Sequence, residues 1–329
     1  MRVRGAADPA LIKTRLGESA QAMVRESAPK LAAERRMMAM HGQTYTDFQT
    51  DLKVVDLQMV GKTAKLTAIE NTKLRLFVAE EVHNAPEATE YVRNHVFTFV
   101  NRNGQWDMVA DELLDEPAAT KALPGENFAP VTEPPTEIPS AQPQGSDSGP
   151  MLSHSRRLPV LAAQTGYLNR SAIVNYAYAY WYNYNPNYRR FDGNTQGGDC
   201  TNFVSQALRA GGWTNVPGWY QYNFVWWYDW LNQSYTWTSA NYWFQFTNSR
   251  PRGTIARYIS DLQPGDILQA DWDRDGRIDH SMIVTKKDSY GNIYLTYHSN
   301  STLNKSFYSI YSANPNATYY GWRLYSYPN

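Results

Sequence analysis

Cysteine is nearly absent from this sequence, which has 329 residues and a single cysteine at position 200. One cysteine excludes an internal disulfide framework and any zinc cluster built from several thiolates, and it leaves the redox compartment undetermined. The 31 basic and 31 acidic side chains cancel, so no overall field attracts the chain to nucleic acid or to an anionic membrane. No run of about 18 apolar residues occurs, so the sequence predicts no transmembrane segment.

Aromatic residues are unevenly distributed along the chain. Ten of the 11 tryptophans and 22 of the 24 tyrosines follow residue 166. Residues 116–150 are rich in proline, serine, alanine and glutamate and show no sustained apolar period, which is typical of an extended linker. The sequence therefore predicts an accessory domain over 1–115, a linker over 116–160 and a second domain over 161–329.

The first half shows the pattern of one helix followed by long antiparallel strands. A helical stretch over 18–42 contains Pro29, which we expect to break or kink it, and Gly42 is a candidate C-terminal cap. Alternating apolar residues over 52–61 predict a strand, as does the stretch 64–78. Two more strands over 95–113 join at Asn103-Gly104, a strong hairpin signal. This α+β pattern resembles NTF2-like or cystatin-like accessory domains, with a helix on a curved sheet. Three histidines in this half, His41, His83 and His95, lack nearby partner residues, so no chemistry is assigned to them.

The cysteine lies at a predicted helix start in the stretch "GGDCTNFVSQ", residues 197–206. Asp199 is a suitable N-cap, and the helix is expected to end at Gly211-Gly212. In the first turn of a helix, unpaired backbone N–H groups and the positive dipole end favour a thiolate and an oxyanion. This location favours a nucleophile with a lowered pKa over a cysteine that only fills the core.

Two histidines in the second half are candidate bases. Residues 280–287 and 292–298 predict two strands joined by the turn around 288–291. Folding this hairpin brings His280 and His298 to the same end, where we expect them to face each other. The register is open by one residue, and a shift by one residue would turn one of them to the other face.

Four blocks within 166–325 resemble the putative amidase domain family of papain-like cysteine hydrolases, which is similar to NlpC/P60 and CHAP cell-wall enzymes. They are "AIVNYAYAYWYNYNPNYRRF", "GGDCTNFVSQALRAGGW", "QPGDILQADWDRDGRIDHSMIVT" and "LTYHSNSTLNKS". The resemblance implies a papain-like α+β domain with its nucleophile helix on an antiparallel sheet. It also implies Cys200 as nucleophile, His280 as base and His298 as the orienting residue, with Asn300 as the alternative if the register shifts. Asp199 and Thr201 match positions that help to bind a substrate amine, although Asp199 is equally well explained as a plain N-cap.

The resemblance further implies a bacterial enzyme that acts on peptide or peptidoglycan amides, outside the cell or in its envelope. The chain start, residues 1–18, is charged and lacks the apolar stretch of an export signal. Two alternatives stay open. One is a binding module without catalysis that grips a glycan or a protein through an aromatic groove. The other is an acyltransferase that uses the same cysteine and histidine.

Two further segments in the second half attract interest. The loop "DWDRDGRID" spaces its carboxylates from Asp271 to Asp279 like the first part of a calcium loop, but Met282 stands where that loop has glutamate. A structural calcium ion is one interpretation, and a simple acidic loop is the other; no cofactor is predicted. Residues 213–247 contain seven tryptophans, of which we expect most to be buried and a few to line a groove.

Overall fold

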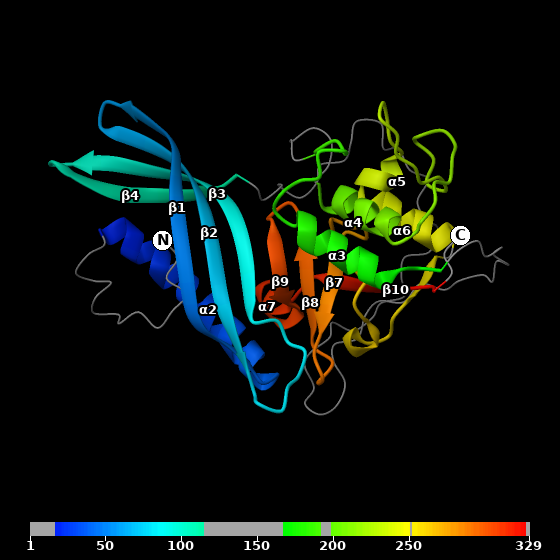
Figure 1. The fold of residues 1–329 in the computed structure, drawn as a ribbon. Helices are drawn as coiled ribbons and strands as arrows, with labels where there is room; N and C mark the ends of the chain where they lie inside the picture. Colours follow the sequence, from blue (N-terminus) through cyan, green and yellow to red (C-terminus); the bar gives the residue numbers. More distant parts are fainter. Residues whose placement is uncertain (1–16, 115–166, 192–198, 251, 327–329) are drawn as a thin grey trace.

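The computed structural model of the chain describes residues 17–114, 167–191, 199–250 and 252–326 (Figure 1). The architecture is α+β, as predicted, with a large, mainly antiparallel sheet and few helices. The predicted linker, residues 116–160, lies outside the described residues. Among the helices described, none is long and apolar enough to cross a membrane.

The described part of the first half, residues 17–114, forms one long helix and four antiparallel strands. Its elements are α2 (Glu18–Met40), β1 (Gln43–Val60), β2 (Thr63–Val78), β3 (Ala88–Arg102) and β4 (Gln105–Leu113). The helix continues through Pro29, so the predicted break is wrong, and Gly42 follows its C-terminal end with a positive φ of 67°. The hairpin signal is confirmed, because Asn103 and Gly104 join β3 to β4 with φ values of 55° and 88°.

Within the residues described from 167 onward, the second half contains five helices, a short 3-10 turn and six strands. In chain order they are α3 (Arg170–Tyr180), α4 (Asp199–Ala210), α5 (Tyr235–Thr238), α6 (Ala240–Ser249), β5 (Gly253–Ile255), η1 (Ile259–Asp261), β6 (Ile267–Asp271), β7 (His280–Lys287), β8 (Ile293–Tyr297), β9 (Thr302–Ser306), α7 (Phe307–Ala313) and β10 (Thr318–Leu324). The predicted nucleophile helix and both strands of the 280–298 hairpin are present.

The sheet of the second half is covered on both faces. One apolar core joins α3, α4 and α6 to residues such as Ile267 and Ile283 of the sheet. The opposite core joins α7 and η1 to the alternate residues, among them Leu268 and Met282. Because successive strand residues point to opposite faces, this division tells which face each residue of β7 occupies.

Most tryptophans of the aromatic segment belong to the first of these cores. Four of the seven are at most 2% exposed, and their rings contact one another; they are Trp213, Trp226, Trp237 and Trp243. Trp219 and Trp230 are instead 57% and 87% exposed. The expectation that most of these rings are buried is confirmed, and exposure alone does not test whether the others line a groove.

The two halves share one continuous sheet. Its order is β1-β2-β3-β9-β8-β7-β6-β10-β5, and β4 also pairs with β3. The junction is the antiparallel pairing of β3 with β9, where Glu90 lies opposite Leu303 and Tyr91 opposite Thr302. Figure 1 shows the first-half strands and those of the second half side by side along this junction, with α2 below.

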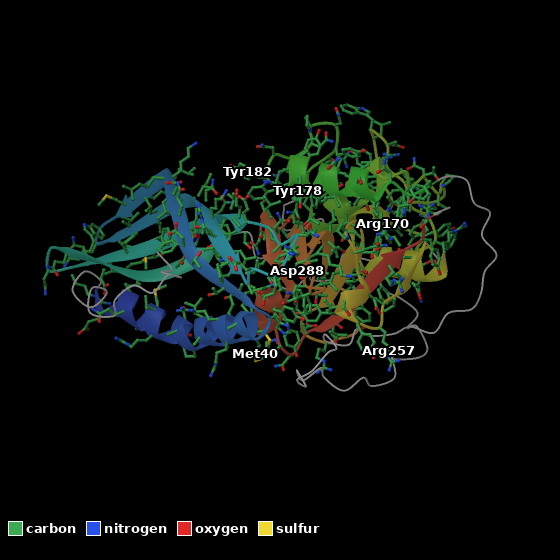
Figure 2. All side chains as sticks on the ribbon, turned by 60° about the horizontal axis from the view of Figure 1, so that its bottom comes forward. Met40, Arg170, Tyr178, Tyr182, Arg257 and Asp288 are labelled. Atoms are coloured by element: carbon green, nitrogen blue, oxygen red, sulfur yellow. The ribbon has the colours of Figure 1, made fainter. Side chains whose placement is uncertain are left out.

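A buried polar network also crosses the junction. The Gln43 side chain donates to the Tyr294 hydroxyl at 2.8 Å and accepts from the Ser306 hydroxyl at 2.7 Å. The Tyr294 hydroxyl in turn donates to the Asp288 carboxylate at 3.0 Å. Asp288 lies in the middle of the molecule, where the two halves meet (Figure 2). The first half is therefore joined to the second by backbone pairing and by satisfied side chains.

Candidate active site

Cys200 occupies the first turn of α4, as the sequence predicts. The helix begins at Asp199, and the side chain of Cys200 is 4% exposed. Backbone N–H groups of Ser281 and Thr201 donate hydrogen bonds to its sulfur, and the Thr201 hydroxyl lies 3.7 Å from it. Since Ser281 directly follows His280 in β7, these contacts place the thiol at the strand end where His280 lies.

The expected lowering of the thiol pKa is wrong for this structure. Burial raises the pKa of Cys200 above its ordinary value, and the negative charge of Asp199 raises it further. The hydrogen bonds from Thr201 and Ser281 act in the opposite direction but do not outweigh burial. At neutral pH the resting side chain is therefore a thiol rather than a thiolate.

His280 begins β7 and is 9% exposed. Its ring lies edge-on to Tyr297, with centroids 5.0 Å apart, and tilted against Trp272 at 5.9 Å. Burial lowers the pKa of His280 to about 4, so the ring is a neutral imidazole at pH 7. Across the described chain, no hydrogen bond holds this ring to another side chain. Its lone pair is available to accept a proton.

The two histidines do not face each other. In the β7–β8 pairing Ile283 lies opposite Thr296, and continuing this register puts His298 opposite Ser281. His298 points to the α4 face, where its ring stacks on Phe203 with centroids 4.0 Å apart. The ring contacts of His280 are with Trp272 and Tyr297, which pack against the other core. The hairpin is present, but the expectation that the two histidines face each other is wrong, by the one-residue register that the sequence left open.

His298 is fully occupied by partners other than His280. Its Nδ1 lies 2.5 Å from Oδ2 of Asp199, and its Nε2 lies 2.8 Å from the backbone carbonyl of Tyr180. A carbonyl oxygen only accepts, so Nε2 carries a proton, and the carboxylate faces the other nitrogen. With both nitrogens bonded, the ring has no atom left to orient His280. The contacts indicate that His298 fixes the start of α4.

The predicted substrate-binding residues are also turned inward. Asp199 is 0% exposed; its Oδ1 accepts from the backbone N–H of Phe191 at 2.9 Å and from the Asn202 amide at 2.8 Å. Thr201 is 0% exposed, and its hydroxyl contacts that of Ser281 at 3.0 Å. A substrate amine could reach either group only by displacing these partners. Thr201 joins α4 to β7, and Asp199 joins the start of α4 to His298 and to the backbone of Phe191.

Asn300 remains as a candidate to orient the base. Its side-chain oxygen is buried and, within the described residues, has no hydrogen-bond partner, and the same holds for the Ser299 hydroxyl. Ser299 has a φ of 73°, an unfavourable backbone conformation for a residue with a side chain. Strained backbone and unsatisfied polar atoms are frequent at functional sites. Here the strained backbone of Ser299 and the unsatisfied side-chain atoms of Ser299 and Asn300 lie in the turn after β8, next to the end of β7 where His280 is found.

The acidic loop after β6 gathers three carboxylates. One oxygen atom from each of Asp271, Asp273 and Asp275 lies within 4.8 Å of the others. Burial raises the pKa of Asp271 to about 6, and both of its oxygens accept backbone N–H groups within the loop, from Arg274 and Gly276. Oxygen ligands of this kind suit calcium, but the loop's own hydrogen bonds already explain its conformation.

Sequence reasoning missed a buried cluster in the first half. His95 is 3% exposed and lies between two carboxylates, with Nδ1 2.6 Å from Asp111 and Nε2 2.8 Å from Glu70. Hydrogen bonds and charges from both raise the pKa of His95 to about 9, although burial opposes the shift. The three residues come from β3, β4 and β2, so no spacing along the chain could have revealed them.

Comparison with known proteins finds a family to which the second half is similar. Residues 167–322 match the family described as "Putative amidase domain". Two curated relatives from Bacillus subtilis (strain 168) are the uncharacterized proteins YhbB and YjcM. The first is 35% identical over 130 residues, 39% of this chain and 40% of the relative; the second is 30% identical over 159 residues, 46% and 36%.

The match therefore spans well under half the length of each curated relative. No solved structure matches the chain significantly, so the papain-like fold stays a prediction. The first half lies outside the matched residues. The part of the chain that carries Cys200, His280 and the aromatic segment is thus similar to a family whose description names an amide hydrolase.

Proposed function

We propose that this protein is a cysteine-dependent amide hydrolase that acts on peptide or peptidoglycan amides, in the cell envelope or outside the cell. One observation carries the proposal. The only thiol of the chain lies in the first turn of a helix and is hydrogen-bonded to the residue that directly follows a buried, neutral histidine. A binding module has no need for this combination.

The reaction proceeds by acyl transfer through a thioester. As the Cys200 sulfur attacks the amide carbon, the ring of His280 turns at the strand end from Trp272 and Tyr297 towards the thiol and accepts its proton, and the carbonyl oxygen becomes an oxyanion. Backbone N–H groups at the start of α4 stabilise this charge. His280 then protonates the departing amine, and water hydrolyses the thioester to release the acid and restore the thiol.

In this proposal Asn300, rather than His298, orients the base. Its buried side-chain oxygen is an unused acceptor for a ring N–H, whereas both nitrogens of His298 are bonded elsewhere. Asp199, Thr201 and His298 act as positioning residues that hold the start of α4 in place against the sheet. The absence of a preformed thiolate means that proton transfer accompanies the attack.

Alkylation of Cys200 by iodoacetamide tests the pair without knowledge of the substrate. We expect the wild type to react at least about tenfold faster than His280→Ala at pH 7, since a positioned base contributes about 100-fold or more. His83→Ala, which removes an exposed histidine, is the matched control and should react like the wild type. Equal rates in wild type and His280→Ala would refute the pair. If the wild type reacts faster as expected, peptidoglycan fragments and simple amides are the substrates to assay.

A further inference from the structure

A cavity lies away from the thiol, at the C-terminal end of α4. Its volume is about 430 Å³, within the range of small-ligand sites. The lining includes three aromatic and three polar side chains: Tyr188, Tyr228, Trp230, Asn187, Arg209 and Asp229. Arg209 follows Cys200 by nine residues in one helix, which corresponds to about 13 Å along its axis. The reacting atoms proposed above are not part of this cavity.

Trp230 stands at the rim and is 87% exposed, although tryptophan is normally well covered. It is held there by a rigid turn. One carboxylate oxygen of Asp229 accepts the backbone N–H groups of Leu231 and Asn232, both at 2.8 Å. The Arg189 side chain donates to the Leu231 carbonyl at 3.2 Å. The indole is thus presented to solvent by a fixed backbone rather than by a loose loop.

The floor of the cavity is equally rigid. The Tyr188 ring lies 5.0 Å from Tyr228 and 6.0 Å from Trp237, a side chain with no exposed surface. The Tyr228 hydroxyl accepts the backbone N–H of Arg189 at 2.7 Å. Rings held in this way need little reordering when a ligand binds, which lowers the entropic cost of binding.

The polar groups at the cavity keep unused hydrogen-bonding capacity. Arg209 donates only through Nη2, to Asn215 and to the Tyr228 carbonyl, and Asp229 accepts only through Oδ1. Within the described residues, the carboxamide of Asn187 has no partner, and no ion pair joins Arg209 to Asp229. The lining therefore offers hydrogen-bond donors from the Arg209 guanidinium and an acceptor oxygen from the Asp229 carboxylate. The Asn187 amide can both donate and accept.

We infer that this cavity is a carbohydrate-binding site that accepts a neutral pyranose ring of an oligosaccharide. The C–H face of a pyranose matches one exposed indole, and hydroxyl groups donate and accept like the surrounding polar groups. One positive and one negative side chain cancel, which favours a neutral ligand over an anion. Among the residues that line the cavity, Trp230 is the exposed large apolar side chain, and its surface is far less than a protein interface requires.

Calorimetric titration of the full chain carrying Cys200→Ala tests this site without interference from turnover. The probes are a β-1,4-linked N-acetylglucosamine tetramer, cellotetraose and trialanine. We expect saturable binding of at least one oligosaccharide and none of trialanine. Trp230→Ala should weaken the dissociation constant by about tenfold or more, and Asn187→Ala by several-fold.

Trp219→Ala is the matched control, because Trp219 is an exposed tryptophan of the same segment that does not line the cavity. It should bind like the parent, and equal melting temperatures would show that all variants fold. The inference is overturned if neither oligosaccharide binds at millimolar concentration, if both tryptophan variants behave alike, or if trialanine binds in a Trp230-dependent manner. Because the titration does not depend on the thiol, its outcome is separate from that of the alkylation test.

Discussion

At the scale of single residues, burial sets the protonation states of the proposed reacting pair. It raises the pKa of Cys200 and lowers that of His280 to about 4, so both are neutral in the resting protein. The resting pair is therefore a neutral thiol and a neutral imidazole, whereas the start of a helix taken alone suggests a thiolate. The desolvation of both groups outweighs the favourable dipole of α4.

This state predicts how the reactivity of Cys200 depends on pH. An ordinary histidine with a pKa of about 6.5 would be about 90% protonated at pH 5.5 and unable to accept a proton. With the pKa of His280 near 4, its ring stays neutral at that pH. We therefore expect the ratio of alkylation rates, wild type to His280→Ala, to persist at pH 5.5 and to fall by half only near pH 4 to 5. A half-fall near pH 6.5 would contradict the burial of the ring.

The pair formed by Asp199 and His298 leads to a different prediction. Removal of one partner leaves the other buried without its hydrogen bond, and an unsatisfied buried polar group costs about 1–3 kcal/mol. We expect His298→Ala to lower the free energy of unfolding by this amount in urea denaturation. His280→Ala should cost less, because its ring donates no hydrogen bond to a described side chain. If His298→Ala left stability within about 1 kcal/mol of wild type, the positioning role would be wrong.

Residues close together in the chain were the ones that the sequence could predict. Cys200 was placed correctly because the signals for the start of α4 are local. The relation between His280 and His298 was not, because a register shift by one residue reverses the face and no local signal fixes it. His95 was missed for a stronger reason, since its partners Glu70 and Asp111 come from two other strands.

At the scale of elements, the junction between β3 and β9 connects the first half to the candidate active site. The backbone N–H of Val92 donates to the carbonyl of Ser301 at 2.9 Å, directly after the turn that contains Ser299 and Asn300. The first half therefore supports the backbone of this turn. Hairpins such as β3–β4 were predicted from their turn residues, but this pairing was not, because its strands are separated by some 200 residues of chain.

The start of β1 supplies a test of this junction. Gln43 is 2% exposed and satisfies both Tyr294 and Ser306 in the second half. Gln43→Ala leaves both hydroxyl groups with one partner fewer, and a buried unsatisfied polar group costs about 1–3 kcal/mol. We expect a loss of this size in urea denaturation. Gln49→Ala on the same strand, where the side chain bonds only to exposed Asp51, should change stability by less than about 0.5 kcal/mol. Equal effects of the two changes would mean that the junction contributes nothing.

At the scale of the whole molecule, the buried histidines make the free energy of unfolding depend on pH in two opposite directions. His41 and His280 have pKa values lowered to about 4 by burial, so their contribution is present above pH 6.5 and is lost as pH falls through 4. His95 has a pKa raised to about 9, so its contribution is present below pH 6.5 and is lost as pH rises through 9. Together they predict greatest stability between about pH 6 and 7.

The alkaline side of this profile belongs mainly to the cluster of His95, Glu70 and Asp111. A shift of this size corresponds to at most about 3 kcal/mol, which disappears between pH 6.5 and 9 as the imidazolium loses its proton between two carboxylates. We expect calorimetric melting temperatures of the wild type to fall over this range and those of His95→Gln to fall much less. The raised pKa of Cys200 adds a decline at the alkaline end, which both proteins share. His83→Gln is the control and should follow the wild type, since His83 is exposed. A decline of the same size in His95→Gln would mean that His95 is not charged in the folded protein, and that the first half is held together without an ion pair at its centre.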